Sequence, residues 1–231
     1  LPDPTVGAGE VLLQILVTGI CGSDIHGFTG ENGRRVPGQV MGHESVARVS
    51  ALGEGVDPDA FPIGRVATFN PVVLASDRME QFAGREQHDL QRRIIGVDPT
   101  LISAFAQFVS VPERNVVLLP DTMPVAYGAL IEPLAVALNA VRRVQVSPGE
   151  SVLIVGGGPI GQSPILAARH EGASAIYVGE LDPARRELCA SLLLGNDATL
   201  EPLTLPDYAI HRLLDRLEVV RLEGFDDVEV V

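Results

Sequence analysis

The glycine-rich segment in the second half of the chain constrains the fold more than any other feature. Ser151–Val155 is a short apolar run, and Gly156, Gly158 and Gly161 follow it directly. An unbroken apolar run is typical of a strand buried on both faces of a parallel sheet. A G-x-G-x-x-G between strand and helix allows a tight turn, close approach of backbone to a pyrophosphate, and close helix packing. We therefore predict a βαβ unit that binds a dinucleotide.

An acidic residue follows this loop at the distance expected for such a unit. The pattern predicts a helix to about His170 and a strand over 175–179, so Glu180 lies about 20 residues beyond the last glycine. A carboxylate there accepts hydrogen bonds from the adenosine ribose and repels a 2′-phosphate, which favours NAD over NADP. Pro159 and Ile160 complete the predicted cofactor-binding loop. The alternative interpretation is a glycine-rich turn without a ligand.

The pattern after Glu180 continues with alternating helices and strands. We predict a helix over 183–194, a short strand over 198–200, a helix over 207–222 and a fourth strand over 226–231. Pro164 falls early in the first helix of this unit, where a proline removes a backbone hydrogen bond. Its sequence context suggests no function for it.

The first half of the chain has a different character. Alternating or β-branched segments over 10–20, 45–52, 64–69 and 105–111 predict strands, and Gly and Pro separate them at short intervals. A long stretch over 127–144 has apolar residues at helical spacing and predicts a helix that joins two domains. We therefore expect a mainly β domain over residues 1–140 and a parallel-sheet domain over 141–231, an α/β chain overall.

Potential metal ligands are concentrated near the N-terminus. Cys21, Asp24 and His26 lie in one segment, and His43 and Glu44 follow in a second. Thiolate, imidazole and carboxylate together suit Zn²⁺, and a catalytic zinc site takes three protein ligands and keeps one position open. A further ligand must therefore come from elsewhere in the chain. The alternative is that Cys21 and His43 are ordinary core residues.

Composition excludes several classes of protein. The net charge of −13 argues against nucleic acid as a partner, since a phosphate backbone needs a basic surface. The chain has no lysine, which excludes a Walker loop and Schiff-base catalysis. No stretch approaches the roughly 20 apolar residues of a membrane span. The two cysteines, Cys21 and Cys189, lie in unlike contexts, so we expect no disulfide and a reducing cytoplasm, with secretion as the alternative.

Several motifs in one order resemble the medium-chain zinc-dependent alcohol and polyol dehydrogenases, closest to their sorbitol dehydrogenase branch. The matching stretches are Gly19-Ile-Cys-Gly-Ser-Asp-Ile-His26, Met41-Gly-His-Glu44, Val116-Val-Leu-Leu-Pro-Asp121, Ile131-Glu-Pro-Leu-Ala-Val136 and Val155-Gly-Gly-Gly-Pro-Ile-Gly161. The resemblance implies a GroES-like, mainly β catalytic domain followed by a Rossmann-type domain.

The resemblance also implies a ligand set for one catalytic zinc. Cys21, His43 and Glu132 match the family's three ligands. Glu44 would lie beside the metal or alternate as a ligand, and Asp24 would orient the His43 ring from behind.

The same resemblance implies how a proton and the cofactor are handled. Ser23 and His26 match the hydroxyl and the imidazole of the family's proton relay, in which Ser23 passes the proton of the bound alcohol toward the cofactor ribose and His26. Glu180 matches the acid that binds the ribose, and Arg185 matches a basic residue near the adenosine side of NAD.

The chain departs from the family pattern in two places. In the family, four cysteines normally hold a structural zinc in the lobe that corresponds to residues 74–89. Alignment places Ala75, Arg78, Gln81 and Asp89 at these four positions. We therefore expect no structural zinc, and a lobe that is packed by other means or disordered. A full member would also continue beyond the last predicted strand. We therefore expect either an incomplete chain or a degraded copy, in which part of the nicotinamide face and substrate pocket is missing.

The leading hypothesis is an oxidoreductase that transfers a hydride between a secondary alcohol or polyol and NAD. A second hypothesis is a catalytically impaired or non-catalytic protein that keeps the fold and binds a nucleotide. A third is a zinc-free reductase on the same fold, which the retained ligands disfavour. The family usually forms homodimers or homotetramers, so the resemblance implies one of these assemblies.

Overall fold

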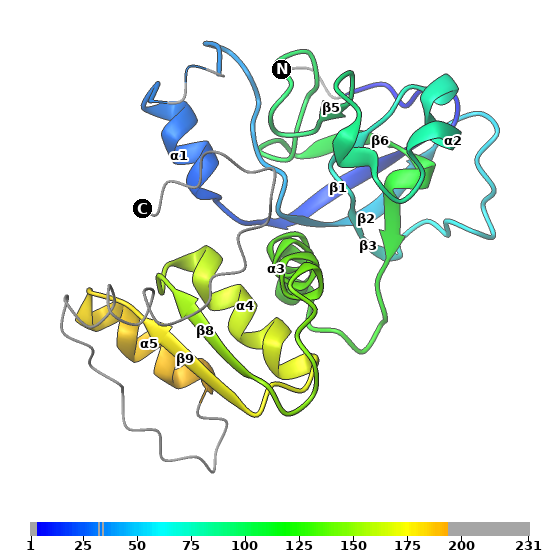
Figure 1. The fold of residues 1–231 in the computed structure, drawn as a ribbon. Helices are drawn as coiled ribbons and strands as arrows, with labels where there is room; N and C mark the ends of the chain where they lie inside the picture. The colour runs from blue at the N-terminus through cyan, green and yellow to red at the C-terminus, as the bar shows by residue number, and fades with distance from the viewer. Residues whose placement is uncertain (1–3, 32, 34, 194–231) are drawn as a thin grey trace. The chain divides into compact units, whose positions relative to one another are not determined.

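The computed structural model describes residues 4–31, 33 and 35–193, which form two compact units divided after Val136 (Figure 1). The strand, helix and fourth strand predicted over 198–200, 207–222 and 226–231 lie outside the described residues. The division after Val136 is close to the boundary predicted at residue 140.

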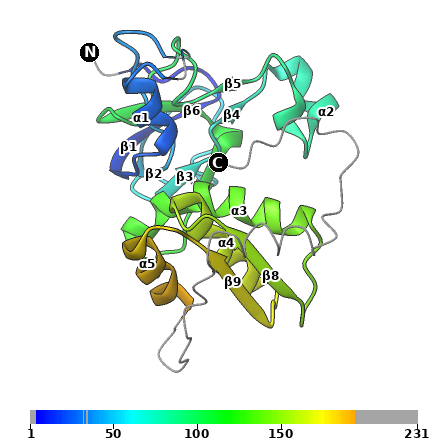
Figure 2. The same cartoon turned by 60° about the vertical axis from the view of Figure 1, so that its left-hand side comes forward.

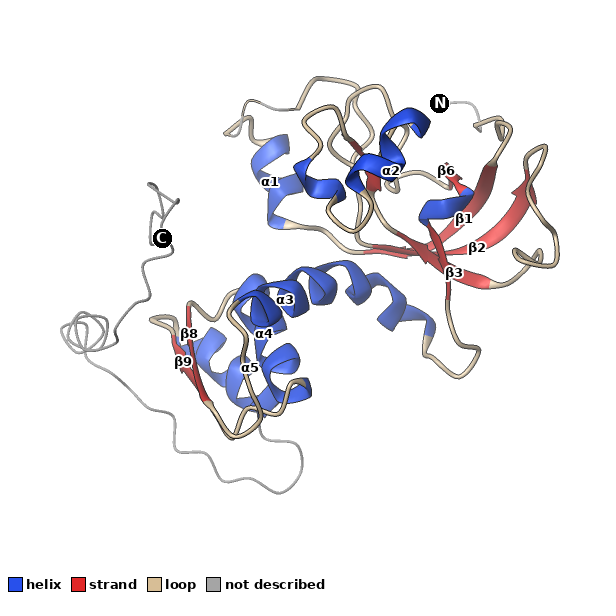
Figure 3. Ribbon diagram, turned by 45° about the vertical axis from the view of Figure 1, so that its right-hand side comes forward, coloured by secondary structure: helices blue, strands red, loops and turns tan. Residues whose placement is uncertain are grey.

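The first unit is built on a five-stranded antiparallel sheet in the order β6-β1-β2-β3-β7 (Figure 3). Its strands are β1 (Glu10–Thr18), β2 (Ser45–Leu52), β3 (Val66–Phe69), β6 (Phe108–Pro112) and β7 (Val116–Leu118). Alternate side chains of these strands, among them Val11, Leu13 and Val49, are fully buried in one apolar core. Because side chains alternate across a strand, this pattern fixes which face of the sheet is covered.

Short elements surround this sheet. They are α1 (Gly22–Phe28), β4 (Val72–Val73), η1 (Ser76–Arg78), α2 (Met79–Phe82), η2 (Glu86–His88), β5 (Arg93–Ile94), η3 (Glu113–Asn115) and η4 (Val125–Leu130). The predicted strand over 105–111 begins three residues later than expected, at Phe108. The residues before it pack instead against the Gly42 region, where Phe105 N–H donates to the Met41 carbonyl.

The cysteine-free lobe is ordered around a buried ion pair. Asp89 is fully buried, and its two oxygens accept from Arg78 Nε and Nη2 at 2.7 and 2.6 Å. The Arg78 guanidinium also lies 5.0 Å from the centre of the Phe82 ring. Two of the four positions that alignment gave to zinc-binding cysteines therefore form a bidentate pair. The lobe is packed by other means than a thiolate cage, one of the two outcomes predicted for it.

We expect Asp89→Asn to lower the melting temperature of this unit at pH 7. The hydrogen bond from Arg78 lowers the pKa of the Asp89 carboxyl below its usual value. A group with a lowered folded-state pKa stabilises the fold above its unfolded pKa, and this contribution disappears as the pH falls through the folded value. Melting curves should show a constant difference between wild type and variant from pH 7 to about pH 5, which shrinks as the pH falls below about 4.

Asp77→Asn is the matched control for this prediction, because Asp77 lies exposed in the same lobe. It should leave the melting temperature nearly unchanged at every pH. Equal melting temperatures for Asp89→Asn and wild type at pH 7 would contradict a stabilising role for the ion pair.

The helix α3 (Ile131–Arg143) continues η4, and together they form the stretch Val125–Arg143. By length and mean hydropathy (1.3) alone, this stretch is long and apolar enough to cross a membrane, which the sequence analysis did not anticipate. It carries Glu132, Arg142 and Arg143, however, so its length and hydropathy are weak evidence for a membrane span. Ala137 and Val141 pack against Ala167 and Ala168 of α4 in an apolar cluster.

The second unit has a parallel βαβ arrangement (Figure 2). Its elements are β8 (Ser151–Val155), α4 (Pro159–His170), β9 (Ala175–Gly179) and α5 (Pro183–Leu193), and both strands have the predicted bounds. Ile154, Ile165 and Cys189 form a buried cluster that joins β8 to the two helices. This cluster packs β8 against α4 and α5.

Pro164 lies inside α4 and does not break it. Its missing N–H leaves the helix without one internal hydrogen bond. The preceding turn is reinforced by side chains, because Ser163 Oγ donates to the Pro159 carbonyl at 3.2 Å and Gln162 Nε2 donates to the Gly157 carbonyl at 2.9 Å.

Candidate functional site

The register of β1 and β2 brings the two predicted ligand segments together. Thr18, the last residue of β1, pairs with Ser45, the first residue of β2. Their hydroxyl oxygens lie 2.8 Å apart, and Gly19 N–H donates to the Glu44 carbonyl at 2.7 Å. Since the strands are antiparallel, the residues after β1 lie beside the residues before β2. Cys21 and His43 are therefore neighbours, although 22 positions separate them.

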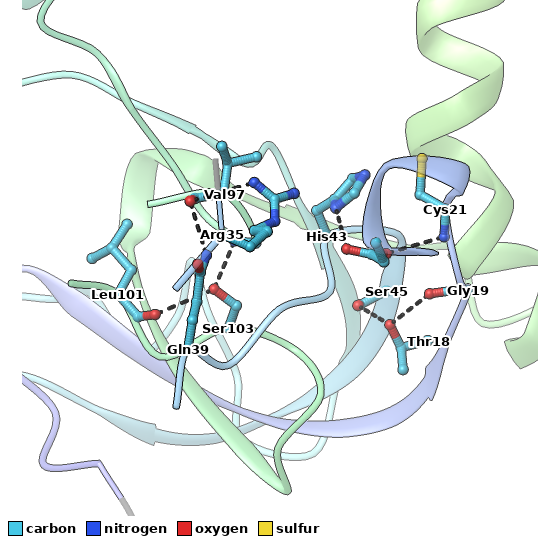
Figure 4. Close-up of polar contacts among 12 residues, drawn as sticks. Thr18, Gly19, Cys21, Arg35, Gln39, His43, Ser45, Val97, Leu101 and Ser103 are labelled. Atoms are coloured by element: carbon cyan, nitrogen blue, oxygen red, sulfur yellow. Dashed lines mark hydrogen bonds and ion pairs between the residues drawn. The ribbon is translucent and has the colours of Figure 1, made fainter. Parts of the chain in front are cut away.

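Cys21, His43 and Glu44 form a cluster in which one ligand atom from each lies within 4.8 Å of the others. Figure 4 shows the Cys21 sulfur and the His43 ring on the same side of the strand ends. Among the residues that the structure describes, this is the group that could hold a metal ion. Thiolate, imidazole and carboxylate are the donors that zinc takes in proteins.

Asp24 lies directly behind these ligands and is 2% exposed. Its Oδ2 accepts from the Cys21 N–H at 3.1 Å, which fixes the first turn of α1. Its Oδ1 lies 3.9 Å from His43 Nδ1, and neither atom has a hydrogen-bond partner among the described residues. An Nδ1–H directed at this carboxylate leaves Nε2 as the ligand atom, the usual arrangement for a histidine that binds a metal.

Glu132 lies in the first turn of α3, close enough to His43 and Glu44 to interact electrostatically with both. Burial raises the pKa of the Glu132 carboxyl, His43 lowers it, and Glu44 raises it. The three-residue cluster contains Glu44 and not Glu132. The structure thus places Glu132 near the other ligands, and which carboxylate is the third ligand stays a prediction.

Ser23 and His26 lie three positions apart in α1, on neighbouring positions of one helix face. His26 Nδ1 lies 2.5 Å from Glu31 Oε2, and both side chains are largely exposed. This contact ties the imidazole to a carboxylate at the surface of the unit. The proton-relay roles of Ser23 and His26 stay predictions.

Residues that the sequence patterns did not single out pack against the His43 ring. Gly96 has a φ of +90°, and a Cβ there would lie 2.9 Å from His43 Nδ1 and 2.9 Å from the Gly42 carbonyl oxygen. Its N–H donates to Ser103 Oγ at 2.6 Å, and Ser103 is fully buried. Only glycine fits this position. A glycine without a surrounding motif gave no signal in the sequence.

The glycine-rich loop of the second unit has the geometry that its motif predicts. Gly156 has a φ of +93°, and a Cβ on Gly161 would lie 1.8 Å from the Gly156 carbonyl oxygen. A Cβ on Gly158 would meet nothing within 4 Å. Pro159 is the first residue of α4 and Ile160 is exposed, so the predicted loop residues surround an open helix N-terminus without a side-chain cap. Such an end attracts a phosphate.

Glu180 follows β9 and reaches back to this loop. Its Oε2 accepts from the Gly157 N–H at 2.7 Å and its Oε1 from the Asp182 N–H at 2.9 Å. These backbone hydrogen bonds, Asp182 first, lower the pKa of the Glu180 carboxyl, so it stays ionised at neutral pH. Arg185 contributes to the same shift from the first turn of α5.

Both predicted sites fit the groups that they would hold. The cluster of Cys21, His43 and Glu44 has the donor types of zinc, and the buried Asp24 and His43 atoms still lack partners there. The loop at Gly158 offers the open space and free helix end that a pyrophosphate needs.

Comparison with known proteins gives the family of the first unit and several relatives of the chain. Residues 7–121 match the alcohol dehydrogenase GroES-like domain family. The chain is 33% identical over 190 residues to sorbitol dehydrogenase of Bacillus subtilis (strain 168), covering 81% of this chain and 53% of that protein. It is 32% identical over 230 residues to L-threonine 3-dehydrogenase of Solibacter usitatus (strain Ellin6076), covering 98% and 64%. The chain thus spans between half and two thirds of these relatives.

Solved structures show the same fold. A putative zinc-binding dehydrogenase from Sinorhizobium meliloti 1021, bound to NADP, superposes with a TM-score of 0.76 at 30% identity, covering 87% of this chain and 57% of that one. 2R,3R-butanediol dehydrogenase from Bacillus subtilis gives a TM-score of 0.76 at 30% identity, covering 93% and 62%.

The fold and the site together define a two-domain α/β protein, with a GroES-like β domain followed by a Rossmann-type parallel sheet. The chain belongs to the medium-chain zinc-dependent alcohol and polyol dehydrogenase family. This confirms the predicted fold class and the resemblance on which the site was first described.

Proposed function

We propose that this protein is a zinc-dependent oxidoreductase that transfers a hydride between a secondary alcohol or polyol and NAD. The observation that carries the proposal is the cluster of Cys21, His43 and Glu44, which lies next to the paired ends of β1 and β2 and has Glu132 nearby. It occurs in a chain similar to named sorbitol, threonine and galactonate dehydrogenases.

Cys21, His43 and Glu132 would hold the zinc, with Glu44 beside it or alternating as a ligand. Zinc bound there would act as a Lewis acid that lowers the pKa of the substrate hydroxyl. Asp24, whose Oδ1 lies 3.9 Å from His43 Nδ1, would orient the His43 ring so that it presents Nε2. Ser23 accepts the proton of the hydroxyl and passes it toward His26, whose imidazole is exposed and can exchange the proton with water.

The second unit binds the cofactor in this proposal. The free N–H groups at the start of α4 receive the pyrophosphate, and Gly158 leaves room for it. The ionised Glu180 accepts from the ribose hydroxyls, and Arg185 lies next to the adenosine side. The anionic Glu180 opposes a 2′-phosphate, which supports NAD although one structural relative is bound to NADP.

Two further features belong to the proposal. Both cysteines are free thiols, which suits a cytoplasmic protein. The resemblance favours a homodimer or homotetramer, which light scattering of the purified protein measures directly.

The proposed activity is tested on the purified wild-type protein. We expect elemental analysis to find about one zinc per chain, as one catalytic site requires. We also expect reduction of NAD in the presence of secondary alcohols or polyols, followed by NADH absorbance. Zinc-free protein from a gentle preparation that oxidises no such alcohol would refute the proposal.

The choice of cofactor is tested by Glu180→Ala. The variant loses a charged acceptor, so we expect NAD binding to weaken roughly 10- to 100-fold and the preference for NAD over NADP to fall. Calorimetric titration with both cofactors measures this. Glu187→Ala, an exposed acid on α5, should bind both like wild type. Unchanged affinities in Glu180→Ala would remove Glu180 from the cofactor site.

A further inference from the structure

Three consecutive glycines, Gly156, Gly157 and Gly158, form the loop between β8 and α4. Glycine populates both signs of φ almost equally, so nothing intrinsic to these residues fixes which way their peptide groups face. A peptide group that turned over would present a carbonyl oxygen, instead of an N–H, to an approaching phosphate. A loop of this composition therefore needs outside contacts to bind an anion well.

Gly157 receives such contacts on both of its polar atoms. Its N–H donates to Glu180 Oε2 at 2.7 Å. Its carbonyl accepts from Gln162 Nε2 at 2.9 Å and from the Cys189 thiol at 3.5 Å. A Cβ on Gly157 would lie 2.9 Å from Cys189 Sγ and 3.1 Å from Glu180 Cβ, so α5 and the residue after β9 enclose this glycine closely.

These contacts determine the direction of the next N–H. The C=O and N–H of a trans peptide point in opposite directions. Because Gln162 and Cys189 hold the Gly157 carbonyl, the Gly158 N–H of the same peptide group must face the other way. No acceptor for that N–H occurs among the described residues, and the space beside Gly158 is open.

We propose that Gln162 is a positioning residue for the pyrophosphate of the cofactor, acting through the Gly157–Gly158 peptide group with Cys189 as a weaker second donor. Gln162 holds the peptide group so that the Gly158 N–H donates to phosphate. The inference rests on the proposed NAD-binding function of this loop and adds two residues to it that the glycine motif does not include.

The carboxamide of Gln162 is the stronger of the two donors. An amide N–H at 2.9 Å is an ordinary hydrogen bond, whereas a thiol is a weak donor. Burial raises the pKa of the Cys189 thiol, and so does the nearby Glu180 charge, so the thiol keeps the proton that it donates. We therefore expect a clear order of effects when the two residues are substituted one at a time.

The test compares Gln162→Met with wild type in titrations with NAD, ADP-ribose and adenosine. Methionine keeps the length of glutamine and lacks the N–H donor. We expect NAD and ADP-ribose to bind roughly 3- to 10-fold more weakly, the effect of one neutral hydrogen bond. Adenosine has no phosphate, so its affinity should be unchanged. A loss of general folding would weaken all three ligands alike.

Two further variants complete the experiment. Cys189→Ala should weaken NAD and ADP-ribose less than Gln162→Met does, and it keeps the proposal testable if that variant folds poorly. Ser163→Ala is the matched control, because this neighbouring side chain donates to the Pro159 carbonyl within α4 and not to the Gly157–Gly158 peptide group. It should bind all three ligands like wild type.

The outcomes separate this inference from the proposed function. Equal losses for adenosine and ADP-ribose, or no loss for either in Gln162→Met, would overturn the positioning role while NAD binding by wild type stands. Wild-type protein that binds neither NAD nor ADP-ribose would refute the proposed function and this inference with it.

Discussion

Replacing Cys21 with alanine is expected to remove the bound zinc and to lower NAD-dependent alcohol oxidation by more than about 100-fold. Substituting groups that only support a metal ligand typically costs 10- to 100-fold in metal affinity or activity, and Cys21 would be a ligand itself. Its sulfur is the soft donor of the cluster, and alanine offers nothing in its place. Elemental analysis and NADH absorbance measure the two effects.

Cys189→Ala is the matched control for zinc content, because it removes the other free cysteine, which belongs to the second compact unit. It should keep one zinc per chain. A Cys21→Ala protein that retains stoichiometric zinc after dialysis would show that the metal, if any, is held elsewhere. Comparing the zinc content of Glu132→Gln and Glu44→Gln then identifies the third ligand, since the true ligand should cause the larger loss.

Gly161→Ala is expected to damage the second unit itself. The new Cβ would lie 1.8 Å from the Gly156 carbonyl oxygen, a backbone atom that cannot move without shifting the end of β8. Overpacking of this kind typically costs about 1 to 3 kcal/mol, and sometimes more. We expect a lower melting temperature and loss of NAD binding together, measured by calorimetry and titration.

Gly158→Ala separates folding from binding in the same loop. A Cβ there meets nothing within 4 Å, so the melting temperature should stay close to that of wild type. The methyl group would nevertheless occupy the space proposed for the pyrophosphate, and NAD should bind more weakly.

For the first of these two variants, a Gly161→Ala protein that melts and binds NAD like wild type would contradict the predicted clash with the Gly156 carbonyl oxygen.

Much of the architecture could be predicted from the sequence because local signals were strong there. Ser45–Leu52, Ser151–Val155 and Ala175–Gly179 have the predicted bounds, since each is an apolar or alternating run next to glycine or a turn. The segment near Phe105 was placed early because its alternation continues beyond the paired strand, and pairing with β1 decides where the strand begins.

The metal cluster was predictable in part. The order of the motifs predicted that Cys21 and His43 lie together, but only the β1–β2 register explains why they are neighbours. That register includes two irregularities that no local sequence pattern encodes. Glu44 rather than Glu132 completes the tight cluster. That difference depends on the side-chain directions at the start of α3, which helical spacing alone does not determine.

Contacts between distant residues were the least predictable. Arg78 and Asp89 were considered only as failed cysteine positions, and their pairing appears once the lobe folds. Gln162 and Cys189 carried no signal, since a glutamine in a first helical turn and a buried cysteine are common without any role. Their shared contact with Gly157 is a property of the tertiary structure.

The pairing of Thr18 with Ser45 has a consequence for how such a protein can diversify. Both ligand segments are attached to the ends of neighbouring strands, so the metal pocket does not depend on the length of the chain between them. Residues 29–40 form mostly irregular, exposed chain in the described part of that connection. Insertions or deletions there can reshape the surroundings of a substrate while the ligands stay where the sheet holds them.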